Sequence, residues 1–222
     1  YRLLAPGARP EWSGIVPGCS HYHHYKRPTL IHTIDRQSEQ LHIAGIEKVP
    51  RSDLSFMTSD VSRFDLPEAY VLLVPGSSAR MAVKRWPATH YAALAERLAA
   101  RGVTPVVLGG VGESDAIATI INQCPEAINL EGRTTIFDIP ELGRRALGCA
   151  GNDTGPMHMV AMTGCPTVAI FSTRSFPDKA APRGPGVRVL VRENLSDLAV
   201  DDVETALARL TADVAATGTH YC

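Results

Sequence analysis

Short apolar strands alternate with amphipathic helices along most of this chain. Residues 70–76, YVLLVPG, form a β-rich run that ends in Pro-Gly, and residues 86–102 follow with apolar positions spaced three and four apart. Pro87 suits the first turn of this predicted helix, and Gly102 comes directly after its last turn. The two segments therefore predict a strand followed by a helix.

The same order repeats downstream. Further strands are predicted at residues 104–110, 126–132, 147–152, 166–171 and 188–193, and further helices at residues 113–124, 137–146, 156–164 and 200–216. Because Val-, Leu- and Ile-rich strands that alternate with helices form parallel sheets covered on both faces, the sequence predicts an α/β, doubly wound domain. Ligands of such domains bind beyond the carboxyl ends of the strands, so the loops that follow several strands are expected to converge on one crevice.

The first part of the chain lacks this alternation. Residues 1–34 are rich in Pro, Gly, His and Arg and are predicted to be mostly loop, with a short strand near residues 13–16. Residues 35–45 suit a helix, and a polar linker follows. The histidines of HYHH, residues 21–24, lie near Cys19, but their spacing is irregular and no second ligand pair follows, so no metal site is predicted.

Composition and charge exclude several classes of partner. The chain has 222 residues, of which 45% are hydrophobic and 20% charged, enough for one large or two small domains. A net charge of -1 provides no global field to recruit nucleic acid or an anionic membrane. No apolar run approaches the roughly 20 residues that span a bilayer. The five scattered cysteines include no CxxC pair, which indicates a reduced, cytoplasmic protein.

The motif GNDTGPMH stands between two apolar runs. Pro156 has no N–H and fits the first turn of a helix capped by Thr154 or Gly155. The backbone N–H groups of such a turn lack intrahelical partners and the helix dipole adds positive charge, so a phosphate is a suitable ligand. Thr154 and His158 add further donors, whereas Asp153 would repel a phosphate and suits the loop or a sugar hydroxyl. A capped core helix without a ligand is the alternative.

The stretch PGSSARMAVKRWP follows the first strand of the alternating part. Gly76 allows the backbone to approach a ligand closely, Ser77 and Ser78 supply hydroxyl groups, and Lys84 is one of three cations in the loop. A diphosphate would match this loop, although a solvated basic surface loop has the same composition. Two anion-suited loops at the same sheet edge favour the diphosphate.

The loop GGVGES contains neither the full GxGxxG pattern nor GK[ST], so neither a Rossmann fingerprint nor a Walker A motif is present. Its Glu113 is able to accept two hydrogen bonds from a ribose diol. The same residue equally suits the first turn of the next helix, where the dipole favours an acid.

Four stretches together closely resemble glycosyltransferase family 9, the ADP-heptose lipopolysaccharide heptosyltransferases and their relatives. They are PGSSARMAVKRWPATHYAALAERLAARG, VVLGG followed by Glu113, NLEGRTTIFDIPEL and AGNDTGPMHMVAMTGCPTVAIF, in this order. The match covers residues 70–172 and extends upstream through HTIDRQSEQLHIAGI. The resemblance implies a GT-B fold, in which two Rossmann-like domains face each other across a cleft and the C-terminal domain holds the nucleotide sugar.

The resemblance also implies a role for each matching residue. The donor diphosphate would contact Ser77, Ser78 and Lys84, the ribose Glu113, and the adenine the segment at Thr134. Sugar and phosphate would contact Asp153, Thr154, Gly155 and Pro156, with His158 close by. The family is inverting and needs no metal or other cofactor to bind the diphosphate. Lys84 is the predicted catalytic residue, because it would stabilise the leaving nucleoside diphosphate as the glycosidic bond breaks.

The general base of the family is an Asp early in the N-terminal domain, upstream of anything that matches this chain. Because the chain begins abruptly at Tyr1, we expect residues 1–62 to be the end of an N-terminal acceptor domain and its linker, with the upstream part missing. Residues 63–199 would form the C-terminal nucleotide-sugar-binding domain. Residues 200–218 would form a closing helix that crosses back to the N-terminal domain.

The predicted function is inverting transfer of a sugar, in the first place heptose, from an ADP-sugar to a lipopolysaccharide core or another glycan acceptor. It would take place in the cytoplasm, with at most peripheral contact with the inner face of the inner membrane. Ser172, Thr173 and Arg174 replace the GPT-type turn of the family, which leaves another donor sugar open. Two alternatives remain, a nucleotide-sugar epimerase of GT-B fold and a nucleotide-binding module without catalysis.

Overall fold

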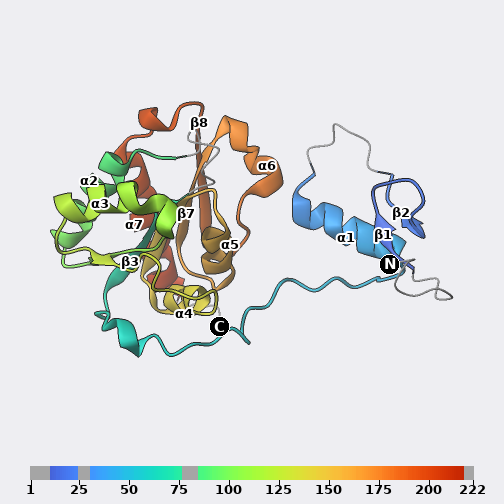
Figure 1. The fold of residues 1–222 in the computed structure, drawn as a ribbon, viewed down its shortest axis with the longest axis horizontal. Coiled ribbons are helices and arrows are strands. Elements are labelled where there is room, and N and C mark those ends of the chain that lie inside the picture. Colours follow the sequence, from blue (N-terminus) through green and yellow to red (C-terminus); the bar gives the residue numbers. More distant parts are fainter. Residues whose placement is uncertain (1–10, 25–30, 77–84, 218–222) are drawn as a thin grey trace. The chain divides into compact units, whose positions relative to one another are not determined.

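The computed structural model describes residues 11–24, 31–76 and 85–217, which belong to two compact units (Figure 1). The first unit comprises residues 1–52 and 178–180. Its elements are β1 (Ser13–Gly14), β2 (His21–Tyr22) and α1 (Thr33–Ile43), with the two strands parallel. The predicted short strand and helix are confirmed, whereas β2 occupies the histidine stretch that was predicted as loop.

Two histidines of the HYHH stretch lie beside carboxylates. His21 Nε2 lies 3.2 Å from Glu11 Oε2, and His23 Nε2 lies 3.3 Å from Glu39 Oε2. In the three described ranges, no three His, Cys, Asp or Glu side chains are grouped so that they could hold a metal ion.

The second unit is built on a six-stranded parallel sheet, as the alternation of strands and helices predicted. In spatial order its strands are β5 (Ile128–Asn129), β4 (Thr104–Val107), β3 (Tyr70–Val74), β6 (Gly148–Asn152), β7 (Thr167–Ser172) and β8 (Val187–Arg192). The chain therefore starts in the middle at β3, builds outward to β5, and then returns beside β3 to build outward in the other direction. This order is that of a doubly wound nucleotide-binding domain.

Helices cover the sheet (Figure 1). The longer ones are α2 (Ala88–Ala99), α3 (Ser114–Gln123), α4 (Asp138–Arg145), α5 (Gly155–Met162) and α7 (Val200–Thr217). The shorter ones are α6 (Pro177–Ala180) and the 3-10 turns η1 (Ser62–Phe64), η3 (Val111–Glu113), η4 (Thr173–Ser175) and η5 (Leu195–Asp197). Buried side chains of α2, α3 and α7 share one core with Val71 and Leu73 of β3. Helices α4 and α5 pack against each other, and α5 contacts β6 and β7.

The side chains of β3 and β6, the two central strands, explain how closely the sheet and its helices pack. All five residues of β3, YVLLV, are buried, as expected for a strand covered on both faces. Its neighbour β6 reads GCAGN and is also buried throughout. A Cβ at Gly151 would lie 2.7 Å from the Cβ of Val74, and one at Gly148 would lie 2.7 Å from Leu207 Cδ1. The small residues of β6 therefore allow β3 and the helices to approach closely.

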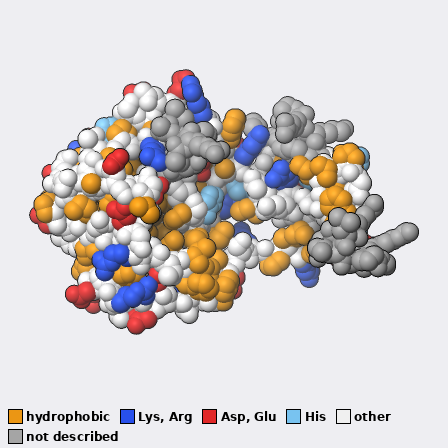
Figure 2. All heavy atoms as spheres, in the orientation of Figure 1, with side chains coloured by type: hydrophobic (Ala, Val, Ile, Leu, Met, Phe, Trp, Pro, Cys, Tyr) orange, Lys and Arg blue, Asp and Glu red, His pale blue; other side chains and the backbone are white. Residues whose placement is uncertain are grey.

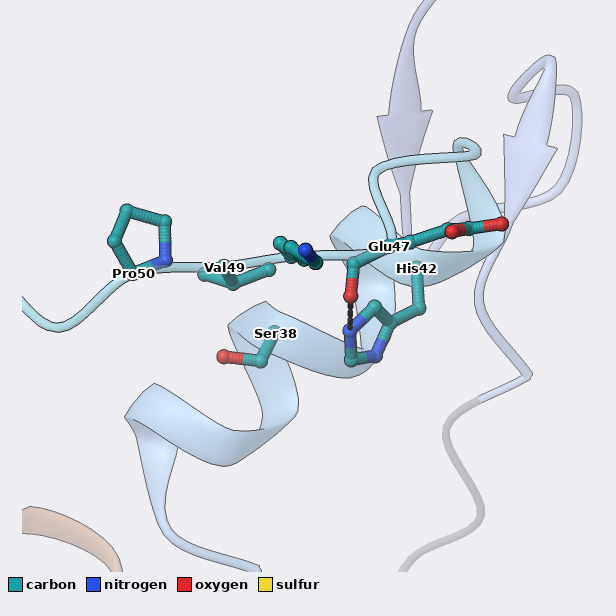
Figure 3. Close-up of a pocket in the computed structure, with 6 residues that line it drawn as sticks. Ser38, His42, Glu47, Val49 and Pro50 are labelled. Atoms are coloured by element: carbon teal, nitrogen blue, oxygen red, sulfur yellow. Dashed lines mark hydrogen bonds between the residues drawn. The ribbon is translucent and has the colours of Figure 1, made fainter.

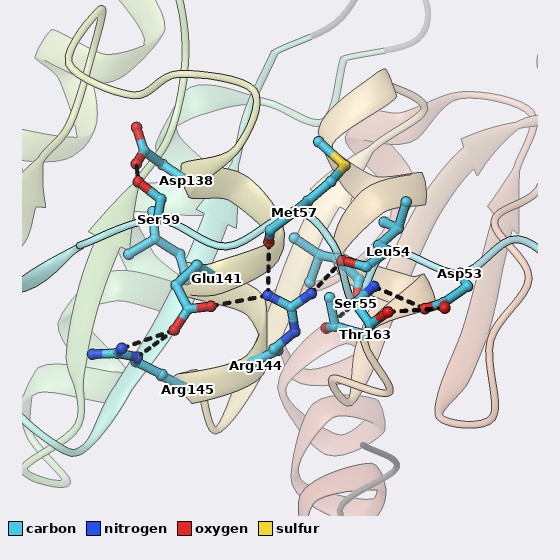
Figure 4. A network of polar contacts seen from close by, with 12 residues as sticks. Asp53, Leu54, Ser55, Met57, Ser59, Asp138, Glu141, Arg144, Arg145 and Thr163 are labelled. Atoms are coloured by element: carbon cyan, nitrogen blue, oxygen red, sulfur yellow. Dashed lines mark hydrogen bonds and ion pairs between the residues drawn. The ribbon is translucent and has the colours of Figure 1, made fainter.

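The second unit begins earlier than the predicted boundary at residue 63. It includes Asp53 onward, because Arg144 Nη1 donates to the carbonyl of Met57 at 2.9 Å and Ser59 Oγ donates to Asp138 Oδ1 at 2.5 Å (Figure 4). At the other end, α7 packs on the sheet through Val203, as well as through Ala206 and Leu207. That the closing helix also reaches an N-terminal domain stays a prediction.

The surface of the second unit shows no single charge sign on the face drawn in Figure 2, where Lys and Arg side chains are interspersed with Asp and Glu. Among the described residues, no helix has the length and apolarity needed to cross a membrane.

The four cysteines in the described ranges are free thiols, and burial raises the pKa of Cys149 well above its ordinary value.

Candidate functional site

The order of the strands creates a switch point between β3 and β6. The connection from β3 leads away on one side, to β4, and the connection from β6 leads away on the other side, to β7. Open α/β sheets of this order bind ligands at such a switch point, beyond the carboxyl ends of the strands. Both anion-suited loops predicted from the sequence begin at this point.

Asn152 joins the two loops. It ends β6 and is completely buried. Its Nδ2 donates to the carbonyl oxygen of Pro75 at 2.7 Å, and its Oδ1 accepts from the N–H of Trp86 at 3.0 Å. One side chain thus holds both ends of the loop after β3 against the end of β6. No role for Asn152 was predicted from the sequence, although a polar residue at the end of an apolar strand is a recognisable signal.

Trp86 fixes the second of these ends from the other side. Only 1% of the residue is exposed, and its Nε1 donates to the carbonyl of Leu198 at 2.9 Å. Its ring meets the ring of Tyr91 edge-on, with centroids 4.8 Å apart. The start of α2 is therefore rigidly placed. Ser77, Ser78 and Lys84, which the sequence predicts to bind the diphosphate, lie outside the described residues.

The first turn of α5 follows the other loop. Thr154 is the N-cap in an extended conformation with φ -146° and ψ 163°, and Pro156 lies in the first turn, as predicted. The Thr154 side chain makes no capping hydrogen bond, and its Oγ1 is buried without a hydrogen-bond partner among the described residues. A Cβ at Gly155 would meet no atom of the described residues within 4 Å. The amides of Gly155 and Met157 also lack a partner within the described part of the chain.

Buried polar atoms normally have hydrogen-bond partners, so the Thr154 hydroxyl is an exception that requires an explanation. It lies where a helix presents N–H groups and the positive end of its dipole. This combination suits an anion with several acceptor oxygens. Asp153 and His158, on either side in sequence, are half-buried, and each already has an interaction partner.

Glu113 lies beside the loop after β3. Its Oε2 accepts from the N–H of Gly110 at 2.8 Å, and a Cβ at Gly76 would lie only 3.1 Å from its Cγ. The structure therefore gives Glu113 a capping role through one oxygen. Its Oε1 has no hydrogen-bond partner among the described residues, so a ribose hydroxyl can still be accepted there.

The loop after β5 continues the same edge. Thr134 lies half-buried in it, and the N–H of Gly132 donates to the carbonyl of Gly109 at 2.9 Å, which joins this loop to the one after β4. The structure thus brings the described residues predicted for nucleoside and phosphate to one edge of one sheet. They follow β4, β5 and β6 in turn.

The loop after β7 lies on the opposite side of the switch point. Asn152 pairs with Ile170, so the end of β7 at Ser172 lies level with the start of the α5 loop. The hydroxyls of Ser172 and Ser175 are buried and 3.2 Å apart, whereas Arg174 is exposed. Phe176 adopts a left-handed conformation with φ 51°. The residues that replace the GPT-type turn therefore form a compact turn, in which Arg174 is the exposed cation.

A separate groove lies within the first unit (Figure 3). It runs between α1 and the segment that follows it, and His42 Nε2 lies 3.1 Å from the carbonyl oxygen of Glu47 across it. The residues that line it are Ser38, His42, Glu47, Lys48, Val49 and Pro50. It shares no residue with the sheet-edge loops, and the sequence predicted no site there.

The strand order and the loops at the switch point define a doubly wound α/β domain of the type in which ligands bind at the carboxyl edge of the sheet. The family model of glycosyltransferase family 9 (heptosyltransferase) matches residues 29–204. The chain belongs to glycosyltransferase family 9, as its motifs predicted.

Individual relatives agree with this assignment. Lipopolysaccharide heptosyltransferase 2 of Salmonella typhimurium is 31% identical over 148 residues, which are 64% of this chain and 42% of the relative. The solved structure of the E. coli ADP-heptose lipopolysaccharide heptosyltransferase II is 26% identical, with a TM-score of 0.63 over 75% of this chain and 53% of that one. A family 9 glycosyltransferase from Veillonella parvula has the same fold, with a TM-score of 0.76 at 20% identity over 89% of this chain and 64% of that one.

These solved structures confirm the predicted GT-B type of α/β fold. The chain spans less than half of the length of the curated relatives that it matches.

Proposed function

We propose that this chain binds an ADP-sugar at the carboxyl edge of its sheet and acts in an inverting glycosyl transfer, with heptose as the donor sugar and a lipopolysaccharide core as the acceptor. The proposal depends on the buried hydroxyl of Thr154 at the first turn of α5, which has no hydrogen-bond partner among the residues that the structure describes. The names of the relatives, which are ADP-heptose and lipopolysaccharide heptosyltransferases, supply the donor and the acceptor class.

The switch point suits the diphosphate. One phosphate would accept from the Thr154 hydroxyl and the amides of Gly155 and Met157. From the loop after β3, Ser77, Ser78 and Lys84 would contact the other phosphate, as the family resemblance implies. Asn152 supports this arrangement, because it ties Pro75 and Trp86, which flank that loop, to the strand that leads into Thr154.

The remainder of the donor would extend in both directions from the diphosphate. The ribose would reach Glu113, whose Oε1 accepts its hydroxyls, and the adenine would reach the segment at Thr134. The sugar would lie toward Asp153, His158 and the loop after β7. Pro156 would contribute by shaping the first turn of α5, because its ring fixes φ near the helical value.

In the transfer step, the acceptor oxygen forms a bond to the anomeric carbon from the face opposite the diphosphate, while the bond from that carbon to the phosphate oxygen breaks. The proton of the acceptor hydroxyl passes to a carboxylate base, and ADP leaves with the electron pair of the broken bond. Negative charge grows on the leaving phosphate during this step. Lys84 and the first turn of α5 would stabilise this charge more in the transition state than in the ground state, which is what accelerates a reaction.

The binding part of the proposal is testable with two matched variants at opposite ends of α5. Thr154→Val removes the unpaired hydroxyl, and Thr163→Val removes a hydroxyl that donates to the carbonyl of Val160 at 2.7 Å at the far end. By calorimetric titration, Thr154→Val is expected to weaken ADP binding by about tenfold or more, since one hydrogen bond to a charged group contributes about 1.5–3 kcal/mol. Thr163→Val is expected to leave the affinity unchanged. Equal affinities in all three proteins would contradict the phosphate site.

Donor and acceptor need a second experiment. Incubation of the full-length protein with ADP-heptose and a Kdo-lipid acceptor, followed by mass spectrometry of the lipid, is expected to show one added heptose. ADP binding without product from any of several acceptors would favour the non-catalytic binding module. An ADP-sugar converted to its 2-epimer without an acceptor would favour the epimerase.

A further inference from the structure

A buried carboxylate joins two segments beside the nucleoside end of the proposed donor site. Asp138, the first residue of α4, is completely buried. Its Oδ2 accepts from the N–H of Thr135 at 2.6 Å, from Thr135 Oγ1 at 2.8 Å and from Arg63 Nη2 at 2.6 Å. Its Oδ1 accepts from Ser59 Oγ at 2.5 Å (Figure 4). Each oxygen is therefore occupied, which makes the burial of a charge tolerable.

The first segment that Asp138 holds is residues 53–64, here called the strap. A second anchor lies near the end of α4, where the Arg144 guanidinium donates to the carbonyls of Met57 and Leu54 (Figure 4). Phe64 is buried at the end of the strap, with the guanidinium carbons of Arg63 and Arg133 4.3 and 5.7 Å from its ring centroid. The strap is thus fixed to the second unit at separate points along its length.

The second segment is residues 133–137, here called the β5 loop. It follows the outermost strand on the β4 side of the switch point. Ile136 and Phe137 expose large apolar side chains there, and Val111 does so on the neighbouring loop. A diphosphate at the switch point with its ribose at Glu113 would direct the base toward these side chains. Flat apolar rings bind to such surfaces, and the loop backbone supplies hydrogen bonds to ring nitrogens.

We propose that Asp138 is a positioning residue for nucleotide recognition, which fixes the backbone at Thr135 so that the β5 loop is pre-formed for the base. The inference rests on the proposed function, because it assigns the nucleoside to this edge. Asp138 itself touches no ligand. It acts by bonding both the N–H and the hydroxyl of Thr135, and the strap supplies the two further donors that keep the carboxylate in place.

The role is specific to the base, so the test compares a ligand that has a base with one that lacks it. Asp138→Asn replaces a charged acceptor of four hydrogen bonds with a neutral amide, whose NH2 group must face either the three donors at Oδ2 or the Ser59 hydroxyl at Oδ1. ADP binding is expected to weaken by about five- to tenfold, while binding of inorganic pyrophosphate changes by less than about twofold. Arg144→Gln is the matched control, since it releases the strap from the other end of α4 without touching Thr135. It is expected to leave both affinities within about twofold of the wild-type values.

A milder variant keeps the test valid if Asp138→Asn fails to fold. Thr135→Val removes only the hydroxyl bond and is expected to weaken ADP by about threefold and pyrophosphate not at all, with Thr135→Ser restoring the wild-type value. Loss of ADP and pyrophosphate affinity to the same extent, or of neither, in variants of a protein whose wild type binds ADP would overturn the role of Asp138. A wild type that binds no ADP would instead contradict the proposed function.

Discussion

The side-chain amide of Asn152 donates to the backbone carbonyl of Pro75 at 2.7 Å, across the switch point of the sheet. The same side chain accepts from the N–H of Trp86 at 3.0 Å. Pro75 and Trp86 lie on either side of the segment that carries Ser77, Ser78 and Lys84. Both are therefore bonded to the same buried residue. That residue lies two positions before Thr154 in the chain. The geometry of the proposed diphosphate site thus depends on Asn152.

Asn152→Ala is expected to lower both stability and ADP affinity. It leaves the Pro75 carbonyl and the Trp86 N–H without these partners, and each such loss costs about 1–3 kcal/mol, so the free energy of unfolding in urea is expected to fall by about 2–6 kcal/mol. Asn129→Ala is the control, because Asn129 also lies at the end of a strand but is exposed, and its side chain accepts from the N–H of Glu131, a near neighbour in the chain. A cost for Asn152→Ala no larger than that for Asn129→Ala would contradict the bridging role.

Thr154→Val is expected to raise the stability of the ligand-free protein while it weakens ADP binding. Valine has nearly the same shape, and an unpaired buried hydroxyl costs about 1–3 kcal/mol that the substitution removes. Thr163→Val should have the opposite effect on stability, since it breaks a hydrogen bond of 2.7 Å. Thermal unfolding without nucleotide measures both. A lower melting temperature for Thr154→Val than for the wild type would show that its hydroxyl has a structural partner.

Lys84→Ala tests the residue predicted to be catalytic. Loss of a charge-assisted contact to a diphosphate is expected to weaken ADP binding at least about fivefold, with the difference shrinking at high salt. The exposed Lys48, in the first unit, provides the control, and Lys48→Ala should leave ADP affinity unchanged. If Lys84→Ala changes ADP affinity by less than about twofold, Lys84 does not contact the phosphates.

Acid is expected to destabilise the second unit through Asp138. Burial alone would raise the pKa of this carboxyl, but hydrogen bonds from Ser59, Thr135 and Arg63 outweigh burial and lower the pKa from 3.8 to about 2. Because the folded pKa is the lower one, the ionised carboxylate stabilises the fold fully above pH 3.8, and this stabilisation of about 2 kcal/mol is lost as the pH falls toward 2. In urea unfolding between about pH 5 and about pH 2, Asp138→Asn should show a shallower decline than the wild type. Parallel declines would contradict this assignment.

Much of the second unit could be predicted from local sequence. The apolar run at residues 70–76 predicted β3, because a strand that is buried on both faces is apolar throughout. The apolar residues spaced three and four apart in residues 86–102 predicted α2, because a helix buries one face. Pro156 predicted the start of α5, since proline has a strong preference for the first turn. These signals lie within a few residues of the elements that they predict.

The contacts that organise the candidate site could not be predicted in this way. The partners of Asn152 are at positions 75 and 86, and those of Asp138 include Ser59 and Arg63. Hydrogen bonds between residues so far apart in the chain leave no periodic pattern. The histidine stretch was misleading for a related reason, because the strand β2 there is formed by pairing with Ser13 and Gly14 and not by a β-rich sequence. The family motif identified Thr154, but its unpaired hydroxyl is visible only in three dimensions.

A crystal structure of the chain with ADP tests most directly whether the switch point binds a diphosphate. A phosphate oxygen is expected within about 3 Å of Thr154 Oγ1 and of the Gly155 amide, with the ribose at Glu113. ADP in the groove between Ser38 and Pro50 of the first unit, or elsewhere on the protein with the first turn of α5 unoccupied, would contradict the proposed site.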